Sequence, residues 1–159
     1  MTWEDIQPFI ARLNEAQSRY TYRLPTEAER EYAARGGMPS TFQHRYPTGE
    51  ADAGKIGDFI WYDRNASGRT HQVGTKKPNP YGLHDMAGNV CELTSDWYRE
   101  YPATAEVDPV GPEKNFRRVI RGGSWHRSKQ YQRSGYRGPG FLPEAVSTQV
   151  GFRLVRTPR

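Results

Sequence analysis

Hydrophobic positions near the start of the chain follow a helical spacing. The apolar residues fall on one helix face at i, i+3, i+4 and i+7: Ile6, Phe9, Ile10 and Leu13. Thr2 precedes this run and Asp5 stands three residues later, which is the arrangement of a capping box. The pattern predicts an amphipathic helix that begins just after Thr2 and tolerates Pro8 near its first turn.

A second helix is predicted shortly afterwards. Thr26 and Glu29 form another capping box, and the pair Gly36–Gly37 supplies a stop signal. The hydrophobic residues between these signals indicate a modest inner face: Ala28, Tyr32 and Ala33. We therefore expect this helix to pack through small and aromatic side chains.

Regular periodicity disappears from Met38 to Pro80, where Gly, Pro, Asn, Asp and Ser recur every few residues. The aromatic residues of this stretch are expected to attach it to the body of the protein: Phe42, Tyr46, Phe59, Trp61 and Tyr62. Strand-like runs follow at 89–98, 118–125 and 151–156. The last two flank a long connection, residues 126–148, which we call the 126–148 loop.

Composition supports a loop-rich fold over a helical bundle. Only 35% of the residues are hydrophobic, and 16 Gly and 12 Pro favour turns, so the aromatic 13% must supply much of the core. A length of 159 residues suits a single domain, 1–159. No apolar run approaches the ~20 residues of a membrane span, so we expect no membrane association and take a cytoplasmic location as the default. Cys91 is the only cysteine, which excludes an internal disulfide and a cysteine-based metal cluster.

The net charge of +5 is unevenly distributed. Residues 1–113 carry 12 Lys/Arg and 17 Asp/Glu, whereas residues 114–159 carry 11 Lys/Arg and one acid, Glu144. In the 126–148 loop the cations alternate with aromatic residues and glycines, a pattern that favours an ordered contact surface over a solvated tail. No nucleic-acid-binding motif accompanies these charges, so we expect acidic protein surfaces, carboxylates or glycans as partners.

Four motifs carry a resemblance to a known family: YRLPTEAEREYAARGG, NPYGLHDMAGNVCELTSDWY, RVIRGGSW and GFRLVR. In this order and spacing they resemble the formylglycine-generating enzyme, or sulfatase-modifying factor, family from about Trp3 to Arg156. The resemblance implies an α+β, C-type-lectin-like fold in which two helices pack beside twisted antiparallel sheets. Relatives carry a further strand before the first helix, so this chain is N-terminally short relative to the family. An edge left exposed beside the 151–156 run would allow a homo- or hetero-oligomer.

The family's chemistry uses two cysteines just after the Gly-Gly-Ser-aromatic motif, which bind copper as thiolates. The resemblance places Arg127 and Gln132 at these positions, and neither can act as a thiolate ligand. We therefore lean against an enzyme. The competing interpretation is a metal- and oxygen-dependent oxidoreductase with altered ligands, related to this family or to the iron-dependent sulfoxide synthases. The four histidines show no clustered spacing that would favour it: His44, His71, His84 and His126.

A third branch of similar proteins binds ligands, among them the variable proteins of diversity-generating retroelements. In that branch the loop between the Gly-Gly-Ser-Trp motif and the final Gly-Phe-Arg strand is the diversified binding surface. The resemblance thus implies a non-catalytic binding module that uses this loop, and Tyr and Arg are frequent binding hot spots. The candidate ligand-binding residues are His126, Arg127, Ser128, Lys129, Gln130, Tyr131, Gln132, Arg133, Arg137 and Phe141.

The segment HDMAGNVCE is a candidate calcium site. The resemblance implies a structural calcium ion held by these residues: Asp85, Met86, Gly88, Val90 and Glu92. Two carboxylates around a glycine-containing turn agree with calcium's preference for oxygen ligands. The alternative is a tight turn capped by Asn89, with Glu92 paired to an arginine. Arg153 is expected to hold a buried carboxylate or to stack on an aromatic ring, with Asp96 as a candidate partner.

Overall fold

The structure is a computed structural model that describes residues 1–36, 45–48 and 53–159. Both predicted helices are present: α1 spans Trp3–Glu15 and α2 spans Glu27–Ala34. Both capping boxes are formed. The hydroxyl oxygens of Thr2 and Thr26 each accept a hydrogen bond from the backbone N–H three residues later, and their own backbone N–H groups donate to the carboxylates of Asp5 and Glu29. Among the described residues, no helix has both the length and the apolar composition that crossing a membrane requires.

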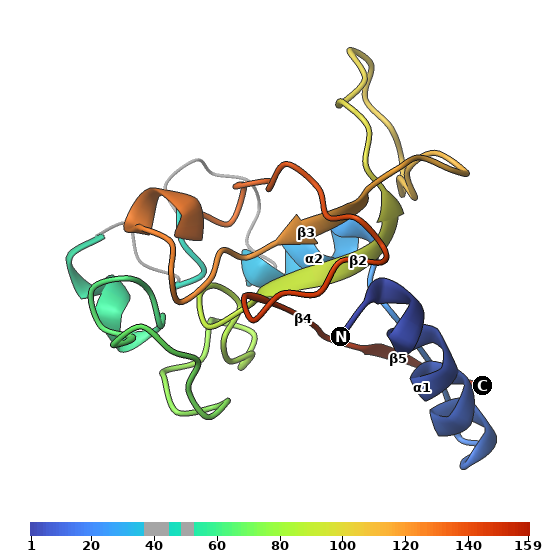
Figure 1. Ribbon diagram of the computed structural model, residues 1–159, viewed down its shortest axis with the longest axis horizontal. Helices are drawn as coiled ribbons and strands as arrows, with labels where there is room; N and C mark the ends of the chain where they lie inside the picture. Colours follow the sequence, from blue (N-terminus) through green and yellow to red (C-terminus); the bar gives the residue numbers. More distant parts are fainter. Residues whose placement is uncertain (37–44, 49–52) are drawn as a thin grey trace.

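Within the described residues, five short strands form two sheets. In the three-stranded sheet β2 is central, antiparallel to β3 and parallel to β4, and in the two-stranded sheet β1 pairs with β5 in antiparallel register. α2 lies against β2 and β3, while α1 packs beside β1 (Figure 1). The bounds are β1 Tyr20–Arg23, β2 Cys91–Trp97, β3 Arg118–Arg121, β4 Val150–Phe152 and β5 Val155–Pro158. The α+β prediction is confirmed, although one pairing is parallel and the 151–156 run is divided between β4 and β5.

In the part of the chain that the structure describes, two hydrophobic clusters hold the fold together. The larger joins α1 to the sheets through Ile6, Ile10, Leu24, Leu93 and Ile120. The smaller contains Tyr46, Ile56, Ile60 and Ala87, with Phe59 and Tyr62 packed against it. Aromatic residues of the irregular stretch therefore do attach it to the body, as predicted, while Phe42 lies outside the described residues. A 3-10 helix, η1 (Ala53–Asp58), provides one of the buried isoleucines of this cluster.

The buried face of α2 is charged, which corrects the predicted inner face. Tyr32 is 60% exposed, whereas Glu27, Arg30 and Ala34 are buried. The Nε of Arg30 lies 3.0 Å from Glu92 Oε2, and Arg121 is paired with Glu27 and Glu31. Hydrophobic spacing did not reveal this face because its arginines and carboxylates are neutralised by partners distant in sequence.

Candidate functional site

The 126–148 loop starts from a backbone turn that only glycine accommodates. Gly122 and Gly123 have φ angles of 96° and 68°. A Cβ at Gly122 would press on the guanidinium of Arg30, and one at Gly123 would collide with the side-chain oxygen of Gln132. The turn is fixed by backbone hydrogen bonds, including that from Gly88 N to Gly122 O at 2.8 Å. The loop therefore leaves the sheet in one defined direction.

Gln132 anchors the middle of the loop from inside. Its side chain is fully buried, and its Nε2 donates to the carbonyl oxygens of Ser124 at 3.0 Å and Arg127 at 2.9 Å. It closes a short 3-10 helix, η2 (Lys129–Gln132). The interpretation of Gln132 as an outward-facing binding residue is wrong, because these two bonds draw the amide under the loop.

Around this anchor the polar side chains face outward. The exposed residues are His126, Arg127, Lys129, Gln130 and Arg133, while Ser128 and Tyr131 are half-buried. The Arg127 guanidinium carbon lies 5.5 Å from the Tyr131 ring centre. We call the outward side of residues 126–133, which excludes the buried Gln132, the loop face. Segments distant in sequence border it, because Ser134 N donates to Arg45 O at 2.8 Å and Asp63 N to Arg127 O at 3.3 Å.

Arg137 and Phe141 do not belong to this exposed face. The Arg137 Nε lies 2.8 Å from Glu27 Oε1, and its guanidinium carbon is 4.2 and 4.3 Å from the ring centres of Tyr98 and Tyr101. Burial and a hydrogen bond to Glu27 raise the pKa of Tyr101 to about 12. The Tyr101 hydroxyl therefore stays protonated at neutral pH and donates to Glu27 Oε1. Phe141 packs on the larger hydrophobic cluster. Both residues were predicted to bind ligand, but the structure uses them to fasten the end of the loop.

The positions of the family's two cysteines do not fit copper in this chain. A guanidinium at Arg127 and an amide at Gln132 supply no thiolate. Burial raises the pKa of the Cys91 thiol to about 11, so this residue stays a neutral thiol at physiological pH. Among the described residues, no group of three or more His, Cys, Asp and Glu side chains is placed to hold a metal ion.

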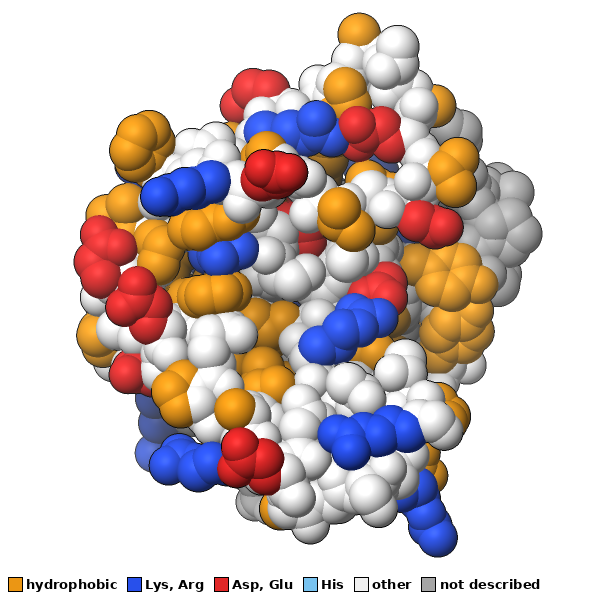
Figure 2. Space-filling model, turned by 90° about the vertical axis from the view of Figure 1, so that its right-hand side faces the viewer, with side chains coloured by type: hydrophobic (Ala, Val, Ile, Leu, Met, Phe, Trp, Pro, Cys, Tyr) orange, Lys and Arg blue, Asp and Glu red, His pale blue; other side chains and the backbone are white. Residues whose placement is uncertain are grey.

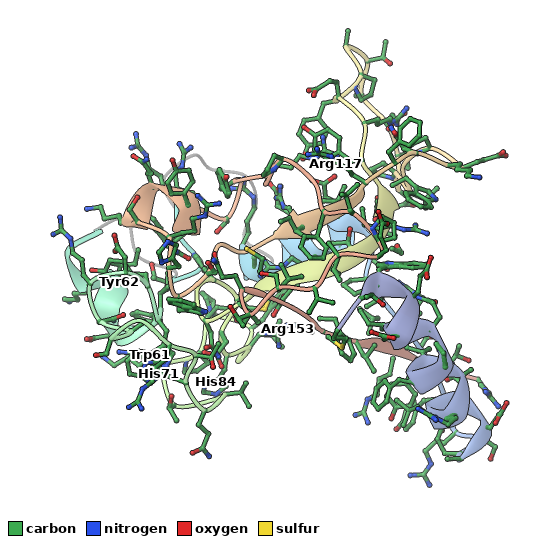
Figure 3. All side chains as sticks on the ribbon, in the orientation of Figure 1. Trp61, Tyr62, His71, His84, Arg117 and Arg153 are labelled. Carbon is green, nitrogen blue, oxygen red and sulfur yellow. The ribbon has the colours of Figure 1, made fainter. Side chains whose placement is uncertain are left out.

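The described histidines outside the loop have local structural partners. The ring of His71 stacks on Trp61 with centroids 3.8 Å apart, and its Nε2 lies 2.8 Å from Ala66 O. The Nδ1 of His84 lies 2.7 Å from Lys76 O. Figure 3 shows Trp61 and His71 side by side, with His84 nearby. His44 lies outside the described residues.

The candidate calcium segment contains one carboxylate oxygen without a partner. Asp85 has a φ of 55°, and its Oδ2 accepts a hydrogen bond from Gly74 N at 2.7 Å. Its Oδ1 is buried and forms no hydrogen bond. A cavity of about 470 Å³ lies beside it, lined in part by Gly88, Val90 and Arg153. Asp85 therefore fits a cation-binding role, whereas the carbonyl oxygen of Met86 already accepts a bond from Arg30 Nη2 at 2.7 Å.

Glu92 follows the alternative arrangement, a carboxylate paired with arginine. Its Oε2 receives Arg30 Nε at 3.0 Å and its Oε1 receives Arg153 Nη2 at 2.8 Å. Burial opposes ionisation, but these two guanidinium groups outweigh it and lower the pKa of Glu92. A carboxylate shared by two cations does not fit a third, doubly charged one. Arg153 does hold a buried carboxylate, but the proposed partner was wrong: Asp96 accepts a hydrogen bond from Glu27 N at 2.7 Å instead.

The sequence did not reveal which segments border the loop face, or that Glu27 binds Arg137 at the end of the 126–148 loop. Arg45 and Asp63 border the face only through backbone hydrogen bonds from an irregular stretch, for which the sequence offers no pairing signal. Glu27 fastens Arg137 across a separation of 110 residues. Its place in the first turn of α2 indicated only a favourable helix charge.

Among proteins of known sequence, this chain is similar to a serine/threonine-protein kinase and to formylglycine-generating enzymes. The chain is 41% identical over 138 residues to the serine/threonine-protein kinase pkn1 of Chlamydia pneumoniae, which covers 84% of this chain and 21% of the kinase. It is 38% identical over 155 residues to the formylglycine-generating enzyme of Thermomonospora curvata, covering 86% of this chain and 50% of the enzyme. The chain thus spans half or less of each of these two relatives.

A solved structure agrees with these sequence matches. Variable protein 1 of Treponema denticola superposes with a TM-score of 0.77 at 37% identity, covering 86% of this chain and 48% of that one. The sulfatase-modifying factor enzyme 1-like domain matches residues 1–158, nearly the whole sequence. The four motifs, the fold and this match agree, and the chain belongs to the sulfatase-modifying factor enzyme 1-like family.

Proposed function

We propose that this chain is a non-catalytic binding module that contacts its ligand through the loop face, residues 126–133. The observation that carries the proposal is that different residues of this loop face solvent and hold its backbone in place. Exposed polar side chains project outward while buried Gln132 fixes the backbone beneath them. A pre-organised loop loses little conformational entropy on binding, which favours affinity.

The charge of the loop face favours an acidic ligand. Arg127, Lys129 and Arg133 are exposed, and none forms an ion pair with an acidic residue in the part of the chain that the structure describes. Tyr131 adds aromatic area beside them. An acidic protein surface, a carboxylate ligand or an acidic glycan fits this arrangement best.

The similarity to variable protein 1 of Treponema denticola supports a finer proposal, that the loop face is a diversified surface. Substitution of exposed side chains would leave the two hydrogen bonds of Gln132 in place. A scaffold of this kind can change its ligand while keeping its fold.

Calcium remains a separate proposal. Asp85 would contribute its unpartnered oxygen, and the backbone oxygens of Gly88 and Val90 would be further ligands, while Glu92 stays with its arginines. The ion would be structural, since it would brace the turn between the irregular stretch and β2.

The competing oxidoreductase interpretation predicts stoichiometric copper or iron in the purified protein, which elemental analysis measures. The donor groups at Arg127, Gln132 and Cys91 give that interpretation no support.

The binding proposal is tested with fluorescein-labelled poly-L-glutamate by fluorescence anisotropy at physiological salt. A triple variant, Arg127→Ser, Lys129→Ser and Arg133→Ser, should bind about ten-fold or more weakly than wild type. A control with the same net charge replaces three exposed arginines elsewhere: Arg12→Ser, Arg19→Ser and Arg69→Ser. Equal weakening in both variants would show non-specific charge attraction and reject the loop face as the site.

A further inference from the structure

A second surface lies on another side of the molecule, between α1, α2 and the connection from β2 to β3. This connection, residues 98–117, projects from the sheet (Figure 1). Two cavities of about 610 and 890 Å³ lie along the outer side of α2, and they share Ala28 and Tyr32 in their linings. We call them together the α2 groove. Figure 2 looks onto this side, where acidic, basic and hydrophobic side chains together border a hollowed centre.

The arginines of the α2 groove already have partners. Each forms an ion pair with a glutamate at 2.5 to 2.8 Å: Arg23–Glu29, Arg35–Glu31, Arg99–Glu106 and Arg137–Glu27. Asp96 in the first cavity and Asp108 in the second form no ion pair with any residue in the described ranges. The groove therefore presents two carboxylates, one in each cavity, that form no ion pair within the described part of the chain.

Asp96 is the better defined of these carboxylates. Its side chain lines the first cavity and the residue is only 4% exposed. Its Oδ2 accepts hydrogen bonds from Glu27 N at 2.7 Å and Ser95 Oγ at 3.3 Å. Burial raises the pKa of Asp96 above its ordinary value, although the guanidinium of Arg118 is near enough to interact with it electrostatically without forming an ion pair. A cation in the cavity would complete this environment.

The walls of the groove are apolar. The second cavity is lined by Trp3, Ile10, Leu24 and Val110, and the first by Trp97 and Tyr101. The sequence from 96 to 113 carries five Asp/Glu and one Arg, a negative balance in a chain whose net charge is positive. Val107 on this connection is 91% exposed. Charge and apolar area thus occur together along one continuous surface.

We propose that the α2 groove binds an extended segment of a partner protein in which basic side chains alternate with apolar ones. One basic side chain pairs with Asp96 and a second with Asp108, and the apolar side chains occupy the walls between them. A peptide fits better than a free polyamine, because the apolar walls would find no counterpart in a polyamine. This surface is separate from the loop face and does not depend on the function proposed for it.

The probe is a fluorescein-labelled peptide of repeating lysine, leucine and serine, measured by anisotropy at physiological salt on the full chain. Asp108→Asn should weaken binding several-fold, and Asp96→Asn together with Asp108→Asn should abolish it. Ala28→Lys places a cation in the middle of the groove and should also abolish binding. Glu113→Gln, an exposed acid on the same connection outside both linings, should leave binding unchanged.

Asp96 also contacts the start of α2, so Asp108→Asn and Ala28→Lys keep the test valid if Asp96→Asn does not fold. Wild-type affinity in both of these variants overturns the proposal, as does the absence of binding to wild type. Replacing leucine by serine in the peptide should reduce affinity strongly. Competition by spermine at concentrations matching the peptide would overturn the assignment to a peptide. Loss of poly-L-glutamate binding at the loop face has no bearing on any of these outcomes.

Discussion

Replacing Gln132 by alanine should destabilise the protein although the residue lies in a surface loop. The substitution removes two buried hydrogen bonds, which contribute about 1 kcal/mol each, and leaves a cavity under η2. Gln132 Oε1 is itself buried without a partner, so removing it recovers part of the cost. We expect the free energy of unfolding to fall by about 2 kcal/mol.

The assay is equilibrium unfolding in urea followed by tryptophan fluorescence. Gln130→Ala is the matched control, because Gln130 is the same residue type two positions away and is exposed, so its change should stay within about 0.5 kcal/mol. Gln132→Glu should be worse than alanine, since it would place a carboxylate against two carbonyl oxygens. If Gln132→Ala unfolds at the same urea concentration as Gln130→Ala, the anchoring role is refuted.

Four further predictions concern Glu92, Glu29, Asp85 and the loop face. Glu92→Gln should lower the free energy of unfolding by about 3 kcal/mol or more in urea, because it leaves two guanidinium groups without a carboxylate; a change below 1 kcal/mol would contradict this. A hydrogen bond from Arg23 lowers the pKa of Glu29 from 4.5 to about 2, so its stabilisation is present above pH 4.5 and lost as the pH falls toward 2. Solvent screening limits that contribution to about 1 kcal/mol, and Glu29→Gln should lack this part of the acid dependence measured by urea titrations. Calcium should raise the Tm in thermal unfolding and Asp85→Asn should remove the rise; equal shifts in both proteins would reject the site. Population sequencing of the gene should find substitutions concentrated at the exposed positions of 126–133, and a loop as invariant as the strands would argue against diversification.

Local signals in the sequence were sufficient to predict the helices and to locate the strands. Both capping boxes use residues three positions apart, so Thr2 and Thr26 mark the helix starts correctly. The 151–156 run was predicted as one strand because no turn-forming residue follows Gly151 within it. Arg153 interrupts it, since its guanidinium turns inward to Glu92, and that partner is 61 residues away.

The candidate site was predicted only in part for the same reason. Cations in a glycine-rich loop indicate an exposed surface, and this is correct for Arg127 and Lys129. It is incorrect for Arg137, whose partner Glu27 is 110 residues away. The neutral Gln132 is also buried, because its amide bonds to backbone carbonyl oxygens at the start of the same loop, which residue type alone does not indicate. The one signal that could have identified Gln132 is the pair of glycines before the loop, which implies a buried neighbour close to the backbone.

The central claim is that the outward side of residues 126–133 contacts the ligand. Its most direct test is the change in backbone amide NMR shifts when poly-L-glutamate is added to the isotope-labelled protein. The largest changes should fall on residues 126–133 and on the neighbouring segments at Arg45 and Asp63. Changes concentrated in 97–111, or spread evenly over the basic residues, would contradict it.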